Sequence, residues 1–222
     1  FYFIPRGSFD LLFSNCTSCG DLALMQQLCE LLGVQPGVTR ADGMVSIDQT
    51  SCVGMCDQGA AALVNGRTLA RLTAAQLPHL AKLVNTATPL DEWPADWFAV
   101  QDNIRHAGLL LNDTLSAGDG LRAAVQAGAD QLLAEIRQAS LRGRGGAGFP
   151  TAMKWQFCRD ATAPEHYVVC NADEGEPGTF KDRVLLHSYA QQVFEGMALC
   201  AYVIKAQHGF LYLRGEYRYL VP

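Results

Sequence analysis

The densest group of residues suited to ligand binding is SLRGRGGAGFPTAMKW, residues 140–155. Its glycines let backbone amides approach a ligand closely, including at positions with φ above zero. Pro150 suits the first turn of a helix, and unpaired amides at a helix start attract phosphate. Glycine content alone fits a plain structural turn as well as a phosphate site. The nearby cations Arg144 and Lys154 favour the phosphate site.

Two familiar nucleotide motifs do not describe this loop. It lacks the Gly-Lys-Ser/Thr ending of a Walker loop. It also follows a predicted helix rather than a strand, which does not fit a dinucleotide-binding fingerprint. We therefore expect an anionic ligand that is held in another way.

A second polar group occupies VVCNADEGEPGTFKDR, residues 168–183. It comes at the carboxyl end of a predicted strand, where α/β folds place their ligands. Most acidic clusters are solvated turns, but two glycines and a proline restrict this backbone. Asn and Asp side chains can hydrogen-bond a flavin ring or ribityl hydroxyls, and a Glu can accept hydrogen bonds from a nicotinamide nucleotide. We expect Lys181 and Arg183 to be structural partners of this acidic turn, whose polar residues are Asn171, Asp173, Glu174 and Glu176.

Four of the eight cysteines form two close pairs, Cys16 with Cys19 and Cys52 with Cys56. Four thiolates can hold zinc or a [2Fe–2S] cluster. No histidine lies close to them in sequence, which suits iron–sulfur slightly better than many zinc sites. Clustered thiols in a chain of this size favour metal ligation in a reducing compartment over disulfides, so we expect the cytoplasm. The other four are expected to be small buried hydrophobic residues: Cys29, Cys158, Cys170 and Cys200.

Composition limits the classes of function. The chain has 222 residues, 49% of them hydrophobic, and a formal net charge of −5. This suits one large domain or two small ones with a buried core. No basic stripe is present to meet nucleic-acid phosphates, and no apolar run reaches the roughly 18 residues that span a bilayer. Because the chain starts at Phe1 and stops at Pro222 after a strand-like run, we expect a fragment of a longer protein.

Hydrophobic periodicity predicts two domains joined by a linker. Residues 1–87 fit a small thioredoxin-like module, with a hairpin turn at Asn65-Gly66. Residues 88–119 contain two tryptophans, two prolines and little periodicity, and are interpreted as a linker. Residues 120–222 alternate helices with strands, which predicts an α/β sheet with largely parallel pairing. The predicted strands are Phe9–Phe13, Val45–Ile47, Ala61–Val64, Tyr167–Cys170 and Phe210–Arg214, and the predicted helices are Asp21–Leu32, Thr73–Val84, Gly120–Ala139, one from Pro150, and Tyr189–Ala206.

The glycine loop and the acidic turn together closely resemble the FMN- and NADH-binding motifs of the flavoprotein subunit of NADH:ubiquinone oxidoreductase and its relatives. The resemblance covers about residues 120–222. It implies hydride transfer between NAD(H), as substrate, and FMN, with no side chain acting as acid or base and hence no catalytic residue. It implies NAD(H) contacts from Phe149, Phe157 and Glu176, although core packing explains Phe157 equally well. It implies FMN contacts from Gly143, Arg144, Gly145, Lys154, Asn171, Asp173 and Glu174.

Residues 1–87 resemble the thioredoxin-like [2Fe–2S] subunit that partners this flavoprotein, here joined to it in one chain. The resemblance implies cluster ligation by Cys16, Cys19, Cys52 and Cys56. The family's first pair is C-x4-C, so Ser14 stands where the first cysteine would be. Either a loop rearrangement brings Cys16 to the cluster, or the cluster is absent and the domain is a structural shell.

Fusion of the two modules resembles the diaphorase subunit of soluble NAD-reducing nickel–iron hydrogenases. We therefore expect an α/β protein, a thioredoxin-like domain followed by a truncated FMN-binding domain, acting as an NADH:acceptor oxidoreductase that passes electrons to iron–sulfur clusters. Expected partners are a small iron–sulfur subunit and hydrogenase or formate dehydrogenase subunits, and any [4Fe–4S] cysteines lie beyond Pro222. The alternatives are the flavoprotein of a formate dehydrogenase or respiratory NADH dehydrogenase, and a non-catalytic assembly module.

Overall fold

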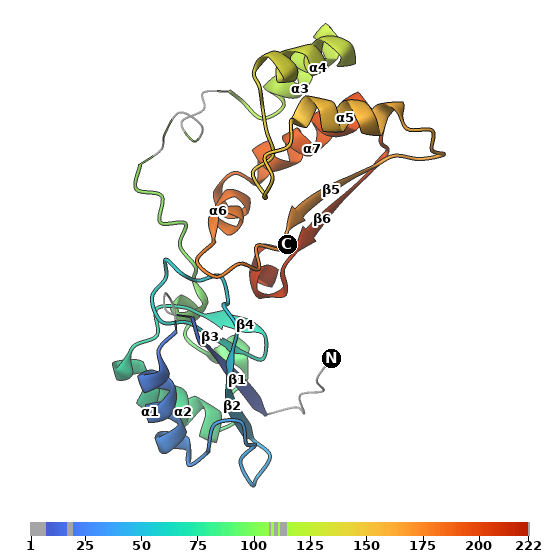
Figure 1. The fold of residues 1–222 in the computed structure, drawn as a ribbon. Helices are drawn as coiled ribbons and strands as arrows, with labels where there is room; N and C mark the ends of the chain where they lie inside the picture. The colour runs from blue at the N-terminus through green and yellow to red at the C-terminus, as the bar shows by residue number, and fades with distance from the viewer. Residues whose placement is uncertain (1–7, 17–19, 107, 109–110, 112–114, 222) are drawn as a thin grey trace. The chain divides into compact units, whose positions relative to one another are not determined.

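The computed structural model describes residues 8–16, 20–106, 108, 111 and 115–221, and the chain divides into two compact units (Figure 1). The first unit comprises Phe1–Asn103, Asp173–Val184 and Leu213–Pro222. The second comprises Ile104–Ala172 and Leu185–Tyr212. The division does not follow chain order, because two segments from the C-terminal half belong to the first unit.

A four-stranded mixed sheet in the order β2-β1-β3-β4 forms the centre of the first unit. Strand β1 pairs in parallel with β2 and antiparallel with β3, which pairs antiparallel with β4. The predicted strands are confirmed, but β4 was missed because three residues show no visible alternation. The bounds are Phe9–Ser14 for β1, Val45–Thr50 for β2, Ala62–Val64 for β3 and Arg67–Leu69 for β4.

The hairpin between β3 and β4 turns at the predicted dipeptide. Asn65 and Gly66 have φ angles of 48° and 77°, the left-handed pair that a two-residue type I′ turn requires. The Asn65 side chain also accepts a hydrogen bond from Asp10 N and donates one to Ser8 O. The turn is thereby joined to the start of β1.

Two helices cover the sheet and bury its apolar side chains. Helix α1 (Leu22–Leu32) makes the crossover that a parallel β1–β2 pair needs. Its N-cap Asp21 accepts a hydrogen bond from Leu24 N, and Gly33 ends it at a φ of 62°. Helix α2 (Leu77–Asn85) follows the short 3-10 helix η1 (Ala74–Gln76). Both helices confirm the prediction made from hydrophobic periodicity. The core that they form with the sheet includes Leu11, Leu28, Ile47, Leu80 and Val84.

The first part of the predicted linker packs against this same core. Trp93 and Trp97 are 3% and 7% exposed, and the Trp93 indole N–H donates to Thr88 O at 2.9 Å. Burying two large rings stabilises a segment whose short 3-10 helices, η2 (Leu90–Glu92) and η3 (Ala95–Phe98), leave no periodicity in the sequence. The domain limits 1–87, 88–119 and 120–222 stay a prediction.

The second unit is built from helices around a two-stranded sheet of β5 (Tyr167–Ala172) and β6 (His208–Leu213). The two strands point the same way in Figure 1, as expected for a parallel pair. Its small core contains Leu133, Ala152 and Val203. The helices of this unit are α3 (Asp119–Ala127), α4 (Ala129–Gln138), α5 (Thr151–Asp160) and α7 (Ala190–Ile204). Helix α6 (Lys181–Ser188) has its first residues in the first unit and its last in the second. The 3-10 helix η4 (Gly215–Leu220) belongs to the first unit.

Two helix predictions need correction. The single helix predicted over Gly120–Ala139 is two helices, because Gly128 between α3 and α4 has a φ of 91° that no helix accommodates. Helix α6 was not predicted, since its eight residues directly follow a turn rich in glycine and proline. Pro150 precedes α5 as its N-cap rather than forming its first turn.

Helix α3 begins at a carboxylate that α7 supplies. Gly118 N and Leu121 N donate to the Glu195 carboxylate at 2.9 and 2.8 Å. These backbone hydrogen bonds, from Gly118 first, hold the pKa of Glu195 below its ordinary value. Amides of a first helical turn need such an acceptor.

We expect Glu195→Gln to lower the melting temperature of the chain by roughly 2–6 °C, because an amide is a weaker acceptor for these N–H groups. A carboxyl whose folded pKa is depressed stabilises the fold above its unfolded pKa, about 4.3 for Glu, and loses that effect as the pH falls through the folded pKa. The difference between the variant and the unmodified chain should therefore shrink below about pH 4. Calorimetry at several pH values measures this, with the exposed Glu135→Gln as control. An equal melting temperature at pH 7 would contradict it.

Candidate functional site

Three cysteine sulfurs gather at one edge of the first unit's sheet. The Sγ atoms of Cys16, Cys52 and Cys56 all lie within 4.8 Å of one another, and those of Cys52 and Cys56 are 3.8 Å apart. Cys19, the fourth predicted ligand, lies outside the described residues. Thiols grouped in this way are the soft donors that zinc or iron–sulfur clusters take. The described residues therefore fit three ligands of such a group.

The strand register explains why these cysteines meet. Strands β1 and β2 pair in parallel as far as Ser14 and Thr50. Cys16 and Cys52 each follow two residues after that last pair, so both leave the same edge of the sheet. Ser14 itself is fully buried as the last residue of β1. It belongs to the strand, whereas Cys16 lies in the loop after β1 and its sulfur lies near those of Cys52 and Cys56 in the loop after β2.

The sulfurs are partly withdrawn from water. Burial is the main cause that raises the pKa of Cys56 to about 11, and the neighbouring Cys52 thiol adds to it. A thiol with this pKa keeps its proton at neutral pH in the metal-free chain. A bound metal would have to displace that proton, which makes binding dependent on pH.

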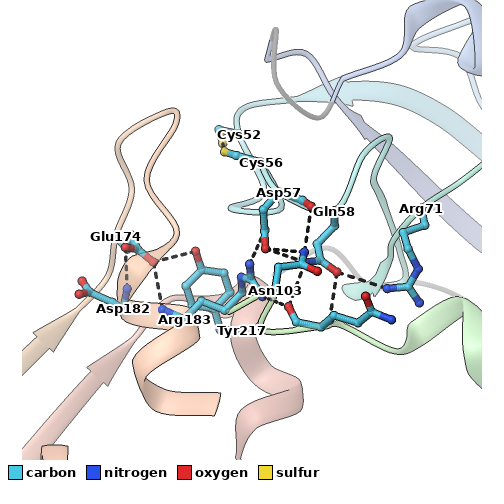
Figure 2. Close-up of polar contacts among 11 residues, drawn as sticks. Cys52, Cys56, Asp57, Gln58, Arg71, Asn103, Glu174, Asp182, Arg183 and Tyr217 are labelled. Atoms are coloured by element: carbon cyan, nitrogen blue, oxygen red, sulfur yellow. Dashed lines mark hydrogen bonds and ion pairs between the residues drawn. The ribbon is translucent and has the colours of Figure 1, made fainter. Parts of the chain in front are cut away.

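In the acidic turn, one carboxylate is buried and fully engaged. The side chain of Glu174 is 1% exposed and accepts hydrogen bonds from Asp182 N, Arg183 N and Tyr217 Oη at 2.8, 3.1 and 3.1 Å (Figure 2). It thereby satisfies amides at the start of α6. Its predicted flavin contact stays a prediction, and its carboxylate already accepts hydrogen bonds from these donors in α6 and η4.

The neighbours of Glu174 differ from it in exposure. Lys181 Nζ lies 3.5 Å from the Glu174 carboxylate, which confirms Lys181 as a partner of the turn. Glu176 is exposed, and Asp173 is half-buried. The Arg183 side chain does not join the acidic turn, because its guanidinium pairs with Asp57.

The glycine loop is closed at its base and open at its tip. Gly143 N donates to Phe149 O, Thr151 N donates to Leu141 O, both at 2.9 Å, and Arg142 and Pro150 form a β-bridge. Residues 143–147 are exposed. A Cβ placed on Gly145 would meet no atom within 4 Å, so its surface is free for a ligand.

The positive side chains and backbone amides near this loop are suited to binding an anion. Arg144 and Lys154 are exposed and form no ion pair with any residue the structure describes. No side chain caps the start of α5, although a helix start carries unpaired amides and partial positive charge. Loop and helix start thus offer the donors that a phosphate needs.

Two aromatic rings flank the loop on the solvent side. Phe149 and Phe157 are 47% and 60% exposed, with ring centroids 6.4 Å apart. The alternative that Phe157 packs in the core is therefore wrong. Exposed rings of this kind can stack on a planar ligand.

The predicted ligand contacts fall in both units. Gly143, Arg144, Gly145, Lys154 and Asn171, with both phenylalanines, belong to the second unit. Asp173, Glu174 and Glu176 belong to the first. The sequence does not predict that Arg183, Arg214 and Tyr217 adjoin the cysteine loop, since buried arginines leave no periodic signal.

Among the described residues, no helix is both long and apolar enough to cross a membrane.

Two family models match the chain: residues 3–85 match the thioredoxin-like [2Fe-2S] ferredoxin, and residues 136–221 match the Nuo51 FMN-binding domain.

Two kinds of known protein are similar to this chain. The NAD-reducing hydrogenase HoxS subunit alpha of Cupriavidus necator is 36% identical over 97% of this chain, which spans 38% of that relative's length. A crystal structure of an NAD+-reducing [NiFe]-hydrogenase matches 98% of this chain and 39% of its own, with a TM-score of 0.92 and 44% identity. NADH-quinone oxidoreductase subunits F of Rhizobium meliloti and Streptomyces coelicolor are 48% and 50% identical over 48% and 44% of this chain, which covers 26% and 22% of them.

We expect Glu174→Gln to lower the free energy of unfolding of the chain by about 1–3 kcal/mol, because the amide is a weaker acceptor than the buried carboxylate and its NH2 group faces donors. Urea unfolding followed by circular dichroism measures the change. Glu176→Gln in the same turn is the matched control, since that side chain is exposed and its loss leaves no buried donor unpaired. Equal stability of the two variants would contradict the capping role.

Proposed function

We propose that the chain forms the FMN- and [2Fe–2S]-bearing part of an NADH:acceptor oxidoreductase. It belongs to the flavoprotein family of NADH dehydrogenases and NAD-reducing hydrogenases. The observation that carries the proposal is the presence of both family domains in one chain, residues 3–85 and 136–221. Because the chain spans less than two fifths of the hydrogenase relatives' length, the activity of the whole protein is part of this proposal.

Coverage favours a hydrogenase context. The hydrogenase relatives match 97–98% of the chain, which includes both domains. The respiratory relatives match less than half of it. The fused arrangement therefore supports the diaphorase subunit of an NAD-reducing hydrogenase over the flavoprotein of a respiratory NADH dehydrogenase. Partner subunits, including a small iron–sulfur subunit, and a place in the reducing cytoplasm follow from the same proposal.

The glycine loop is our proposed phosphate and ribityl site. Backbone amides beside Gly143 and Gly145 would donate to the FMN phosphate, while Arg144 and Lys154 would balance its charge. When bound, FMN exchanges a hydride with NAD(H) and single electrons with iron–sulfur clusters. The side chains have only to bind and orient both ligands. Further proposed flavin contacts are Asn171, Asp173 and Glu174.

The exposed rings of Phe149 and Phe157 are proposed to stack on the nicotinamide nucleotide. Their exposure supports this, because a buried pair would have no free face. Glu176 is exposed and would accept hydrogen bonds from hydroxyl or amide groups of the nucleotide. None of these groups transfers a proton in the proposal.

The [2Fe–2S] ligands are proposed to be Cys16, Cys19, Cys52 and Cys56. The mutual approach of three sulfurs supports Cys16 in place of the Ser14 position, since Ser14 is fixed in β1. This is the one group of three or more metal-ligating side chains found in the part of the chain that the structure describes.

Gly145→Ala tests the flavin site. Its φ lies outside the left-handed region and an added Cβ meets no atom within 4 Å, so the loop should keep its fold. The methyl group would occupy the space of the ligand, and we expect FMN affinity to fall by roughly tenfold or more. Quenching of FMN fluorescence measures it.

Gly196→Ala in α7 is the matched control, since an added Cβ there also meets nothing. Equal FMN affinity in the two variants would contradict the assignment of the loop. Failure of the unmodified chain to bind FMN at all would favour the non-catalytic assembly module.

Cys16→Ala tests the cluster ligands. We expect it to lose the [2Fe–2S] cluster after anaerobic reconstitution, because three thiolates hold the cluster weakly. Ser14→Ala should keep it, as should Cys29→Ala, which changes a buried cysteine away from the site. Iron content and the electron paramagnetic resonance of the reduced protein measure the outcome. Loss in Ser14→Ala with retention in Cys16→Ala would reverse the assignment.

A further inference from the structure

We propose that Arg183, Arg214 and Tyr217 are positioning residues for the metal-binding loop Cys52–Asp57. All three belong to the sequence that matches the FMN-binding domain, whereas the loop belongs to the thioredoxin-like sequence. They lie in the same compact unit as the loop. The inference rests on the proposed cluster for its functional meaning, and it can be tested on the metal-free chain.

Arg214 holds the start of the loop. Its guanidinium donates to Cys52 O at 2.7 Å in a buried hydrogen bond and to Glu174 O at 2.8 Å. An ion pair with Glu216 at 2.8 Å balances its charge. Hydrogen bonds from a charged donor are the stronger kind, and this one acts on the backbone of a proposed ligand.

Tyr217 holds the middle of the loop. Its ring is fully buried in a cluster with Cys52, Val53 and Met55. A Cβ on Gly54 would clash with Tyr217 Oη, so the ring lies directly against the glycine backbone. Gly54 also has a φ of 71°, a conformation that other residues adopt with strain. The loop and the ring thus fit only with glycine at this position.

Arg183 holds the end of the loop. It is completely buried, pairs with Asp57 directly after Cys56, and donates to Gln101 O at 2.9 Å (Figure 2). The Asp57 carboxylate accepts two further hydrogen bonds, from Gln58 and Asn103. Within the described residues the Arg183 Nε–H has no partner. A buried, incompletely paired arginine is poor for stability alone, which favours a role in placing Asp57.

The three contacts act at the beginning, middle and end of one six-residue loop. Glu174 joins two of them, since its carboxylate accepts from Tyr217 and its carbonyl from Arg214. The shape in which Cys52 and Cys56 present their sulfurs thus depends on side chains from outside the thioredoxin-like sequence. Groups that hydrogen-bond the ligand backbone and carry charge nearby also set the reduction potential of an iron–sulfur cluster.

The first experiment alkylates the metal-free chain and follows each cysteine by mass spectrometry. Arg214→Gln should raise the labelling rates of Cys52 and Cys56 by roughly tenfold or more, because local opening exposes them. Cys29, buried in the sheet core, reports global unfolding and should not change. Arg218→Gln, which changes an exposed arginine in the 3-10 helix η4 that follows Arg214, is the control and should match the unmodified chain.

If Arg214→Gln also exposes Cys29, Tyr217→Phe decides the question. It removes only the hydroxyl that donates to Glu174 and keeps the ring on Gly54. Faster labelling of Cys52 and Cys56 with protected Cys29 supports the proposal. The proposal is overturned if Arg214→Gln labels like Arg218→Gln, or, where Tyr217→Phe decides, if Tyr217→Phe does so.

The second experiment reconstitutes the cluster and titrates its reduction potential. Loss of a buried positive charge disfavours the reduced cluster, so Arg214→Gln should lower the potential while Arg214→Lys should stay near the unmodified value. A merely structural role of Arg214 would leave the reduction potential unchanged in both variants. If the unmodified chain takes up no cluster, the proposed function fails while the labelling experiment still judges the positioning residues. A normal cluster with unchanged potential and labelling in Arg214→Gln overturns the positioning alone.

Discussion

The parallel pairing of β1 with β2 is the constraint on which the first unit depends. It requires a crossover, which α1 makes, and it ends at Ser14 and Thr50. The positions of Cys16, Cys52 and Cys56 follow from this end point, because both cysteine loops leave the sheet at the same edge. A register shift of one residue would also turn the buried side chains of β1 to the opposite face, so core packing and sulfur placement are fixed together.

A second constraint is the cost of burying charge. Glu174, Arg183 and Arg214 all have buried side chains, which is tolerable only where each has partners. Glu174 satisfies the amides of α6, Arg214 pairs with Glu216, and Arg183 pairs with Asp57. This network lies where two segments of the C-terminal sequence adjoin the cysteine loop. Removing one partner would leave another charge buried without compensation, so its members should vary together.

The elements with strong local signals were predictable from the sequence. Asp21 and Gly33 mark the ends of α1, and Asn65-Gly66 marks the hairpin, because capping and turn chemistry are short-range. The sequence predicts one continuous helix across Gly128, since one glycine does not by itself end a helical pattern. The burial of Trp93 and the contact of Arg183 with Asp57 depend on residues distant in sequence, and no local pattern predicts such contacts. The sequence predicts the glycine loop from its composition, whereas the exposure of Phe157 depends on the tertiary structure.

The two proposed cofactor regions therefore differ in how they are built. The glycine loop is built locally: its hydrogen bonds run between residues 141 and 151, and an added Cβ on Gly145 or Gly146 would meet no atom within 4 Å. The cysteine loop is the opposite, because its shape relies on arginines more than a hundred residues away in sequence. A ligand held by backbone amides needs only a preformed turn, whereas a cluster that exchanges single electrons needs ligands that move little between redox states. In the proposed cluster site, the contacts of Arg183 and Arg214 would supply that rigidity.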